Sequence, residues 1–395
     1  MTAAPRPLKL LVVAGEASGD RLGAEVVGAV RSAGRAVEAW GVGGPALRAE
    51  GLEAVVNAEA LSVMGLGDVV RRLPDLVAVQ QRLRWLAERR RPDVALLCDM
   101  PDFNHPLGHR LRRAGIPVVG MVAPQAWAWR PARARRLAES LDHLLVLFPF
   151  EVPFFEPWIP TTFMGHPRAL TATHAHADAD ALVLMPGSRP TEVARHLGPL
   201  LAARLRLERL CGARRTLLPV AHTLDRAALS RQLHALGVPS DGVTLVPSAS
   251  DALHQARLAV CASGTATLEA ALAGVPTVVI YRASRSTWLA ARALLEVPYI
   301  AMPNLLCGRR VFPELWQRDV NPDAILRAAR WVLGRTDALT TELAELRRSL
   351  LPAVGTPAER AARVLFEHAN GICQPPRLHA QSPVESLDRP MPPLP

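Results

Sequence analysis

Two aspartates, Asp99 and Asp102, directly follow an apolar run in the stretch DVALLCDMPDFNHP. The run is typical of a buried strand, and Pro101 predicts an extended loop after it rather than a helix. Because α/β proteins bind ligands at the carboxyl ends of their parallel strands, a carboxylate there could act as a general base toward a hydroxyl group. Aspartate is also common in tight turns, so the sequence leaves a purely structural role open.

A second candidate turn, LMPGSRPTEV, places Gly187, Ser188 and Arg189 between a predicted strand and a predicted helix. Backbone N–H groups at a helix N-terminus attract anions, and a guanidinium group matches the geometry of phosphate. We therefore expect an anion site at these residues. An ordinary strand-to-helix turn with a surface arginine is the alternative.

The stretch CASGTATLEAALAGVP is more specific. Ser263, Gly264 and Thr265 begin a predicted helix directly after an apolar strand, and Glu269 lies about one helical turn further on. This order suits a nucleotide whose phosphates contact the turn while the glutamate accepts hydrogen bonds from the ribose. Glu269 could instead pair with another group on the helix surface.

The N-terminal stretch LLVVAGEASGDRLGAEVV has a glycine turn between a strand and a helix but lacks the G-x-G-x-x-G fingerprint of dinucleotide-binding proteins. Glu16 and Asp20 would also repel phosphates placed there. We expect this turn to line the ligand cleft, where Ser18 and Asp20 could form hydrogen bonds with the hydroxyl groups of a sugar that accepts a transferred group. Helix capping by either residue is the alternative.

Strand-like runs alternate with helical patterns through most of the chain, which predicts an α/β fold of two tandem Rossmann-like domains with a ligand cleft between them. The predicted boundaries are 1–172, 181–345, a C-terminal helix within 346–371 that packs back on the first domain, and a disordered tail at 372–395. The histidine-containing segment between the first two domains offers no third metal ligand, so we interpret it as a linker.

The formal net charge of +10 suits an anionic partner, although Lys9 is the only lysine and the arginines also fit a codon bias. Aromatic residues do not alternate with basic ones, so we expect no nucleic acid partner. Five cysteines without a C-x-x-C pair predict reduced thiols. With no long apolar run and no signal-peptide pattern, a cytoplasmic location is the default expectation.

Two further segments carry side chains that are costly to expose. Trp127 and Trp129, in VAPQAWAWR, either pack in the core or line the cleft. The segment LSVMGLGDVVRRL resembles a basic amphipathic helix that could lie on lipid, and a core-facing helix explains the same spacing. Its candidate membrane residues are Val63, Leu66, Val69, Val70, Arg71 and Arg72.

Ten motifs occur in the order found in lipid-A-disaccharide synthases, and the chain resembles that family from about Leu8 to His368. The motifs are VAGEASGDRLGA, GVGGPALRAEG, LSVMGLGDV, DMPDFN, VAPQAWAWR, FPFE, FMGHP, MPGSRPTEV, ASGTATLEAAL and MPNLLCGRRVFPELWQ. The resemblance implies a glycosyltransferase of the GT-B fold type that acts at the cytoplasmic face of the bacterial inner membrane.

The resemblance also implies roles for individual residues. Asp99 matches the proposed general base, Arg189 the essential arginine near the UDP leaving group, and Asn304 and Glu269 positions around the nucleotide. On the acceptor side it suggests Ser18, Asp20, Asp102, Asn104, Gln125 and Trp127. No metal and no cofactor are implied.

The implied donor is UDP-2,3-diacylglucosamine, and the implied acceptor is 2,3-diacylglucosamine 1-phosphate. Family members are reported as dimers, so a homodimer stays open. Two alternatives remain from the sequence. One is another UDP-sugar enzyme on the same scaffold, such as a peptidoglycan glucosaminyltransferase or an epimerase, and the other is a two-lobed binding protein without catalytic activity.

Overall fold

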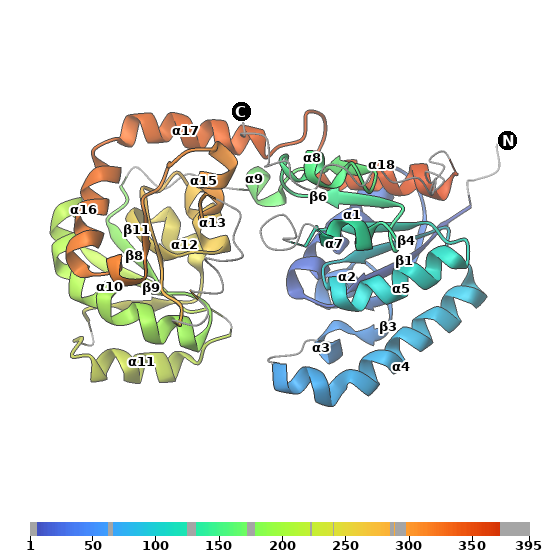
Figure 1. Cartoon of the computed structure of the whole chain (residues 1–395), viewed down its shortest axis with the longest axis horizontal. Helices are drawn as coiled ribbons and strands as arrows, with labels where there is room; N and C mark the ends of the chain where they lie inside the picture. The colour runs from blue at the N-terminus through green and yellow to red at the C-terminus, as the bar shows by residue number, and fades with distance from the viewer. Residues whose placement is uncertain are drawn as a thin grey trace. The chain divides into compact units, whose positions relative to one another are not determined.

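The computed structural model describes residues 6–61, 66–124, 132–171, 178–221, 223–239, 241–284, 288 and 298–371, and of 60, 61, 66–73, 132 and 133 it describes the backbone alone. The chain forms two compact units, of which one extends to Pro167 and resumes at Leu350, while the other spans Arg168–Ser349. Each unit is built on its own parallel sheet (Figure 1).

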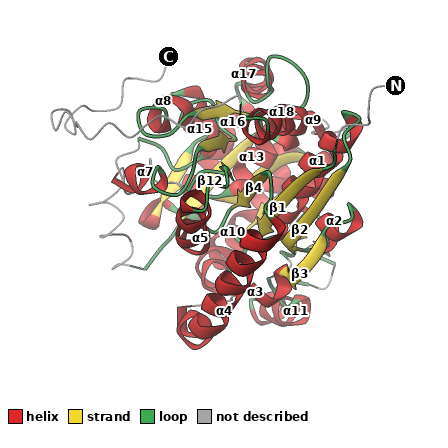
Figure 2. Cartoon of the chain, turned by 90° about the vertical axis from the view of Figure 1, so that its right-hand side faces the viewer, coloured by secondary structure: helices red, strands yellow, loops and turns green. Residues whose placement is uncertain are grey.

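The first unit contains a seven-stranded sheet in the order β3-β2-β1-β4-β5-β6-β7, and every strand pair is parallel. Figure 2 shows β1, β2 and β3 side by side in this sheet. The strands are β1 (Leu8–Ala14), β2 (Val37–Gly43), β3 (Glu53–Asn57), β4 (Val94–Cys98), β5 (Val118–Met121), β6 (His143–Val146) and β7 (Thr161–Phe163). The helices are α1 (Ala17–Ser32), α2 (Pro45–Ala49), α3 (Ala58–Leu61), α4 (Leu66–Arg90), α5 (Pro101–Arg113), α7 (Ala132–Leu137), α8 (Glu151–Phe155) and α18 (Pro357–Ala369).

The second unit contains a six-stranded parallel sheet in the order β10-β9-β8-β11-β12-β13. Its strands are β8 (Ala181–Met185), β9 (Arg215–Pro219), β10 (Thr244–Val246), β11 (Ala256–Ala262), β12 (Thr277–Tyr281) and β13 (Glu314–Trp316). Its helices are α9 (Pro167–Thr171), α10 (Pro190–Cys211), α11 (Arg226–Ala235), α12 (Ala249–His254), α13 (Thr265–Leu272), α15 (Met302–Cys307), α16 (Pro322–Leu333) and α17 (Thr336–Ser349), with a short 3-10 helix at Gln317–Asp319.

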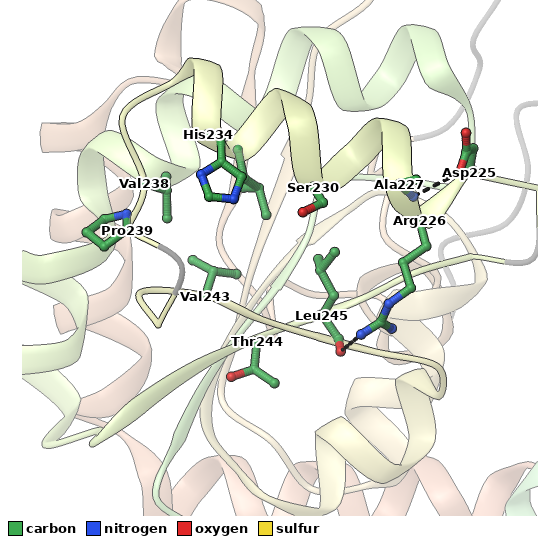
Figure 3. Close-up of a pocket in the computed structure, with 11 residues that line it drawn as sticks. Asp225, Arg226, Ala227, Ser230, His234, Val238, Pro239, Val243, Thr244 and Leu245 are labelled. Carbon is green, nitrogen blue, oxygen red and sulfur yellow. Dashed lines mark hydrogen bonds between the residues drawn. The ribbon is translucent and has the colours of Figure 1, made fainter.

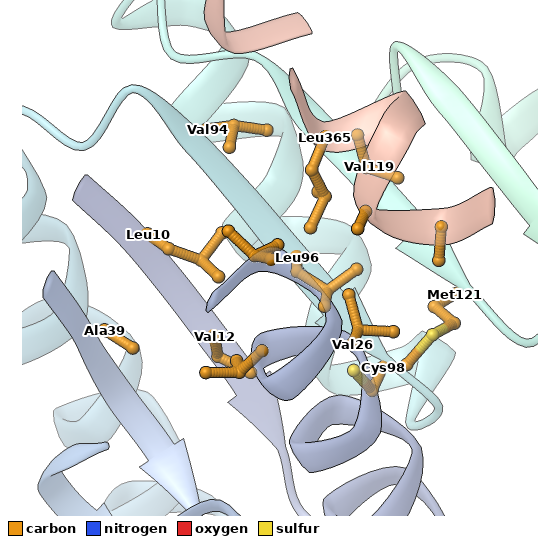
Figure 4. Packing of buried hydrophobic residues seen from close by; sticks show 14 of the residues in the cluster. Leu10, Val12, Val26, Ala39, Val94, Leu96, Cys98, Val119, Met121 and Leu365 are labelled. Atoms are coloured by element: carbon orange, nitrogen blue, oxygen red, sulfur yellow. The ribbon is translucent and has the colours of Figure 1, made fainter. Parts of the chain in front are cut away.

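The central strands are apolar throughout because both faces of each sheet are covered. All five residues of β4 and all five of β8 are buried, as expected for parallel strands with helices on both sides. In the first unit, Leu365 of α18 packs with Val26 of α1 and Leu96 of β4 (Figure 4). The last described helix therefore completes the core of the unit that contains the first strand.

Pro101 corrects one local prediction. We expected it to hold an extended loop, but it is the first residue of helix α5. Proline is tolerated there because the missing N–H has no partner in the first turn and its φ already suits a helix. The backbone instead changes direction at Asp99 and Met100, whose φ angles of 51° and 43° are left-handed.

No helix among the described residues has the length and apolar character needed to cross a membrane.

A buried histidine pair joins α18 to the sheet of the first unit. The rings of His143 in β6 and His368 in α18 meet edge to face with centroids 5.1 Å apart. His143 Nε2 lies 2.9 Å from the hydroxyl of Thr162, and among the described residues its Nδ1 has no partner. Burial, with the neighbouring His368 as a second cause, lowers the pKa of His143 to about 4.

We predict that this pair makes the first unit less stable in weak acid. Since the folded pKa of His143 is about 4 and its ordinary value is 6.5, the unfolded chain binds the proton first, and stability falls as the pH drops from about 6.5 toward 4. The free energy of unfolding is measured in urea at pH 7.5 and 5.0. The decrease between these two pH values should be smaller in His143→Gln than in the wild type, by about 1–2 kcal/mol. The exposed control His109→Gln should keep the wild-type pH dependence, and an unchanged dependence in His143→Gln would contradict the prediction.

Candidate active site

The Asp99 carboxylate lies at the N-terminus of helix α1. Asp99 follows β4, and its Oδ2 accepts a hydrogen bond from the Ser18 hydroxyl at 3.2 Å. The backbone N–H of Gly19 also stabilises the carboxylate and lowers its pKa. The first turn of a helix has unpaired N–H groups and a positive dipole end, both of which favour a negative charge. The turn AGEASGD therefore binds a carboxylate of the same chain.

Gly19 is needed for this contact. A Cβ at position 19 would lie 2.8 Å from Asp99 Oδ2 and 3.2 Å from the Cβ of Cys98. The first distance is too short for any real side chain, so the helix backbone can approach the carboxylate this closely only at a glycine.

The surroundings of Asp99 make its carboxylate more basic than usual. Burial, with the negative charge of Glu16 as the second cause, raises the pKa of Asp99 to about 6, against the lowering effect of the hydrogen bonds from Ser18 and Gly19. A carboxylate with this pKa is ionised at neutral pH and still accepts a proton readily. General bases work best with a pKa near the operating pH.

Asp20 does not line an acceptor site, which corrects that prediction. Its side chain is 3% exposed, and its carboxylate accepts hydrogen bonds from the backbone N–H groups of Gly44 at 2.7 Å, Ala46 at 2.9 Å and Leu47 at 3.1 Å. The capping alternative is therefore correct, but the capped helix is α2 rather than α1. Asp20 ties the turn after β2 to the first turn of α1.

The other predicted acceptor residues are placed as follows. Asp102 is exposed in the first turn of α5. Asn104 is 5% exposed, and both of its amide hydrogens are used by backbone carbonyls, which contradicts a direct contact with an acceptor. Gln125, Trp127 and Val63 lie outside the described residues, as do the side chains of Leu66, Val69, Val70, Arg71 and Arg72.

In the second unit, the turn after β8 holds its own anion. The carboxylate of Glu192 accepts hydrogen bonds from the backbone N–H groups of Ser188 at 3.1 Å and Arg189 at 3.3 Å. Our expectation that these N–H groups are free for a phosphate is therefore wrong in this structure. Gly187 permits the turn with a φ of 121°. The Arg189 side chain is 78% exposed, so its guanidinium remains accessible.

The turn after the neighbouring strand β11 leaves its helix N-terminus accessible. Helix α13 begins at Thr265 after Gly264, and no side chain in the described part of the chain caps it. Gly264 and Thr265 are exposed, while the Ser263 hydroxyl donates a hydrogen bond to the carbonyl of Ile300 at 2.8 Å. Because β8 and β11 are adjacent parallel strands, this N-terminus and Arg189 lie at the same edge of the sheet.

Glu269 and Asn304 have structural partners. The Glu269 carboxylate forms an ion pair with Arg168, which fits the alternative that the sequence left open. Asn304 is fully buried. It donates hydrogen bonds to the Phe312 carbonyl and to Glu314, each at 2.8 Å, and accepts hydrogen bonds from the N–H groups of Val311 and Phe312.

This set uses the full hydrogen-bonding capacity of the Asn304 amide. A direct nucleotide contact by Asn304 is therefore contradicted. Its partner Glu314 accepts hydrogen bonds from the N–H groups of Ile300 and Ala301, and the carbonyl of Ile300 is the acceptor for Ser263. Asn304 thus supports the turn at Ser263 indirectly, through Glu314 and Ile300.

His196 is a residue that the sequence analysis missed. It is fully buried in α10. Its Nε2 accepts a hydrogen bond from the backbone N–H of Arg282 at 2.8 Å, so its Nδ1 carries the proton and donates to the Pro186 carbonyl at 2.6 Å. Burial lowers the pKa of this imidazole, which keeps it neutral. His196 thus joins the turns after β8 and β12, and no motif marks it in the sequence.

No group of three or more His, Cys, Asp or Glu side chains among the described residues is arranged to hold a metal ion. A cavity of about 700 Å³ lies between α11 and β10, where Arg226 donates a hydrogen bond to the Leu245 carbonyl (Figure 3). None of the predicted site residues lines this cavity.

Comparison with known proteins decides the family. The sequence model described as lipid-A-disaccharide synthetase matches residues 10–350. The chain belongs to the lipid-A-disaccharide synthase family. It is 40% identical over 376 residues to the lipid-A-disaccharide synthase of Anaeromyxobacter dehalogenans strain 2CP-C, with 90% of this chain and 97% of that protein covered. It is 42% identical over 335 residues to that of Pseudomonas aeruginosa strain LESB58, with 80% and 87% covered.

Solved structures confirm the predicted GT-B type of fold. A glycosyltransferase of kitacinnamycin matches with a TM-score of 0.60 at 20% identity, covering 92% of this chain and 100% of that chain. MurG of Acinetobacter baumannii matches with a TM-score of 0.53 at 15% identity and the same coverage. A protein described as a putative UDP-N-acetylglucosamine 2-epimerase of Listeria monocytogenes matches with a TM-score of 0.62 at 13% identity, covering 94% and 99%. The chain is a glycosyltransferase of lipid A biosynthesis.

The contact between Asp99 and α1 predicts the effect of a methyl group at position 19. Gly19→Ala should displace the carboxylate and lower kcat for disaccharide synthesis by about tenfold to a hundredfold, because a shift of about 1 Å in a reacting group has an effect of that size. The matched control is Gly28→Ala in the same helix, where a Cβ would have no neighbour closer than 3.7 Å. Equal kcat values for the two folded variants would contradict the assignment of this site.

Proposed function

We propose that this enzyme transfers 2,3-diacylglucosamine from UDP-2,3-diacylglucosamine to 2,3-diacylglucosamine 1-phosphate (lipid X). The products are the β-1,6-linked disaccharide 1-phosphate and UDP, with inversion at the anomeric carbon. The observation that carries the proposal is the half-buried, basic carboxylate of Asp99 at the start of α1, in a chain that belongs to the lipid-A-disaccharide synthase family. The first unit takes the acceptor and the second unit takes the donor.

In the proposed reaction, Asp99 removes the proton from the 6-hydroxyl group of the acceptor. The hydroxyl oxygen attacks the anomeric carbon of the donor as the bond from that carbon to the UDP oxygen breaks. The proton ends on Asp99, and the electron pair of the broken bond leaves with UDP. Ser18 and Gly19 hold the carboxylate in place throughout and fix its direction for proton transfer.

The second unit supplies the positive charge that the leaving group needs. Negative charge develops on the UDP diphosphate as the bond to the sugar breaks. It is stabilised by the exposed guanidinium of Arg189 and by the N-terminus of α13. The two turns are formed by Gly187, Ser188, Ser263, Gly264 and Thr265. In the proposal, Glu269 keeps its ion pair with Arg168 and also accepts hydrogen bonds from the ribose. In this proposal, arginine and helix dipoles take the place of a metal ion, and no cofactor takes part.

The donor phosphates also meet a competing anion at the β8 turn. The N–H groups of Ser188 and Arg189 already donate to Glu192, so the phosphates either bind beside that carboxylate or displace it. The Arg189 side chain is 78% exposed and lies 3.7 Å from Glu192 at one guanidinium nitrogen, so most of its donors stay accessible. The α13 N-terminus is exposed as well. We therefore assign the main phosphate contacts to these two groups.

We further propose that the enzyme acts in the cytoplasm, at the inner face of the inner membrane. The net charge of +10 suits an acidic lipid surface and a phosphorylated lipid acceptor. The segment with Val63, Leu66, Val69 and Val70 is the proposed membrane contact, together with Arg71 and Arg72. A homodimer is part of the proposal, based on the family resemblance.

The wild-type enzyme should lose activity in acid as Asp99 gains a proton. Because the pKa of Asp99 is about 6, the base is ionised above that value and protonated below it, so kcat/KM should fall as the pH drops through about 6. Glu16 raises this pKa, and Glu16→Gln should therefore move the acid limb of the pH profile to lower pH. A limb that stays in place in Glu16→Gln would argue against Asp99 as the group that titrates.

The base assignment itself predicts a large effect of Asp99→Asn. This variant should lose about 10²- to 10⁴-fold in kcat, the usual contribution of a general base, while binding of UDP measured by calorimetry stays as in the wild type. Asp102→Asn, three residues further along the chain in the first turn of α5, is the matched comparison. If Asp99→Asn keeps the wild-type kcat, Asp99 is not the base.

The bridging role of His196 predicts a defect confined to the donor side. His196→Phe removes both hydrogen bonds that join the turns after β8 and β12, so it should weaken UDP binding by about tenfold, the effect of losing one to two buried hydrogen bonds. His234→Phe, at an exposed position of α11 in the same unit, should bind UDP as the wild type does. An unchanged affinity in folded His196→Phe would contradict this role.

A further inference from the structure

The backbone that carries Asp99 adopts a conformation that its residues rarely take. Asp99 and Met100 have φ angles of 51° and 43°, and two successive left-handed residues that are not glycine are unfavourable unless their surroundings hold them. This turn begins directly after β4 and ends at the first residue of α5. The direction of the Asp99 side chain depends on it.

Asn104, in the first turns of α5, is bonded to this backbone on both sides of the strained residue. Its side-chain N–H₂ group donates to the carbonyl of Asp99 at 2.6 Å and to the carbonyl of Cys98 at 3.1 Å. Its own backbone N–H donates to the carbonyl of Met100 at 2.9 Å. One residue thus binds three successive carbonyls across the left-handed turn.

Among the described residues, only the donor end of the Asn104 amide has hydrogen-bond partners. Its Oδ1 is buried and has no hydrogen-bond partner among the described residues, although the side chain is 5% exposed. Two carbonyl oxygens on the other side require an N–H₂ group there, which fixes the orientation of the amide. A buried acceptor without a partner is unfavourable. The side chain thus keeps both of its N–H hydrogen bonds to the turn although its Oδ1 has no partner among the described residues.

We propose that Asn104 is a positioning residue for catalysis, whose amide holds the left-handed Asp99–Met100 turn and thereby directs the Asp99 carboxylate to Ser18 and Gly19. The inference rests on the proposed function, in which Asp99 is the general base. Without the amide, the carbonyls of Cys98 and Asp99 lose their donors, and the turn relaxes toward an ordinary right-handed or extended conformation. The carboxylate then leaves the N-terminus of α1.

Gln80 offers a matched control for loss of a buried amide. Its side-chain N–H₂ group, 8% exposed, donates to the carbonyl of Phe103 at 2.7 Å. It therefore supports the same helix α5 from α4, but this hydrogen bond goes to Phe103 and not to residues 98–100. A general loss of stability in α5 would affect Gln80 and Asn104 variants alike, whereas positioning of Asp99 would affect only the Asn104 variants.

The experiment compares kcat, KM for both substrates and the pH profile of Asn104→Ala, Asn104→Asp and Gln80→Ala, with folding checked by circular dichroism. Asn104→Asp keeps the shape but replaces the donors by a carboxylate, so it should be at least as impaired as Asn104→Ala. We expect both to lose about thirtyfold or more in kcat with KM within about twofold, and the acid limb to shift. Gln80→Ala should keep its kcat within about threefold and its acid limb in place.

Asn104→Ser, which retains one donor, provides a milder variant in case the others do not fold, and an intermediate kcat is expected. Equal kcat values for folded Asn104 variants and Gln80→Ala, or an effect on KM alone, would overturn the proposal.

A double-mutant cycle separates failure of this inference from failure of the proposed function. If Asn104 acts through Asp99, adding Asn104→Ala to Asp99→Asn should lower the residual kcat by less than about twofold. A further drop as large as that in the wild-type background would overturn the positioning role while leaving Asp99 as the base. If Asp99→Asn alone keeps the wild-type kcat, the base assignment fails, and the positioning role fails with it.

Discussion

The contact between the Asp99 carboxylate and the first turn of α1 constrains much of the first unit. Strands β1 and β4 are parallel neighbours, and their last residues, Ala14 and Cys98, are paired in register. This pairing brings the start of α1 to the residue that follows β4. The close approach then requires a glycine at position 19 and a left-handed turn after Cys98. Parallel α/β sheets place ligand sites at this edge, and here a side chain of the protein occupies the helix N-terminus.

Buried polar side chains hold the turns around both proposed subsites. In the first unit, Asp20 fixes the turn after β2 against α1. In the second unit, His196 joins two turns, and Asn304 with Glu314 supports the segment that binds Ser263. Each makes its hydrogen bonds mainly to the backbone, which rigidifies a turn without occupying the ligand site.

The sequence predicted the central strands because continuous apolar runs are the signature of a covered parallel sheet, as in β4 and β8. It did not predict the short edge strands β3, β7 and β13, whose residues are only half-buried or exposed. It also could not separate polar residues that bind ligands from those that satisfy the backbone. Asp20 resembled a ligand contact for this reason, and Asn304 was suggested by the family resemblance alone. His196 and Glu192 were overlooked because their partners are main-chain groups in turns.

The central claim is that this chain joins two acylated glucosamine units with release of UDP. The most direct measurement is to incubate the purified protein with UDP-2,3-diacylglucosamine and 2,3-diacylglucosamine 1-phosphate in the presence of EDTA, and to follow UDP and the tetraacyl disaccharide 1-phosphate by mass spectrometry. The account predicts that both products form in equal amounts, and that they do not form when an acceptor without acyl chains replaces lipid X. Absence of the disaccharide while the protein still binds UDP, or equal turnover of the acceptor without acyl chains, would contradict it.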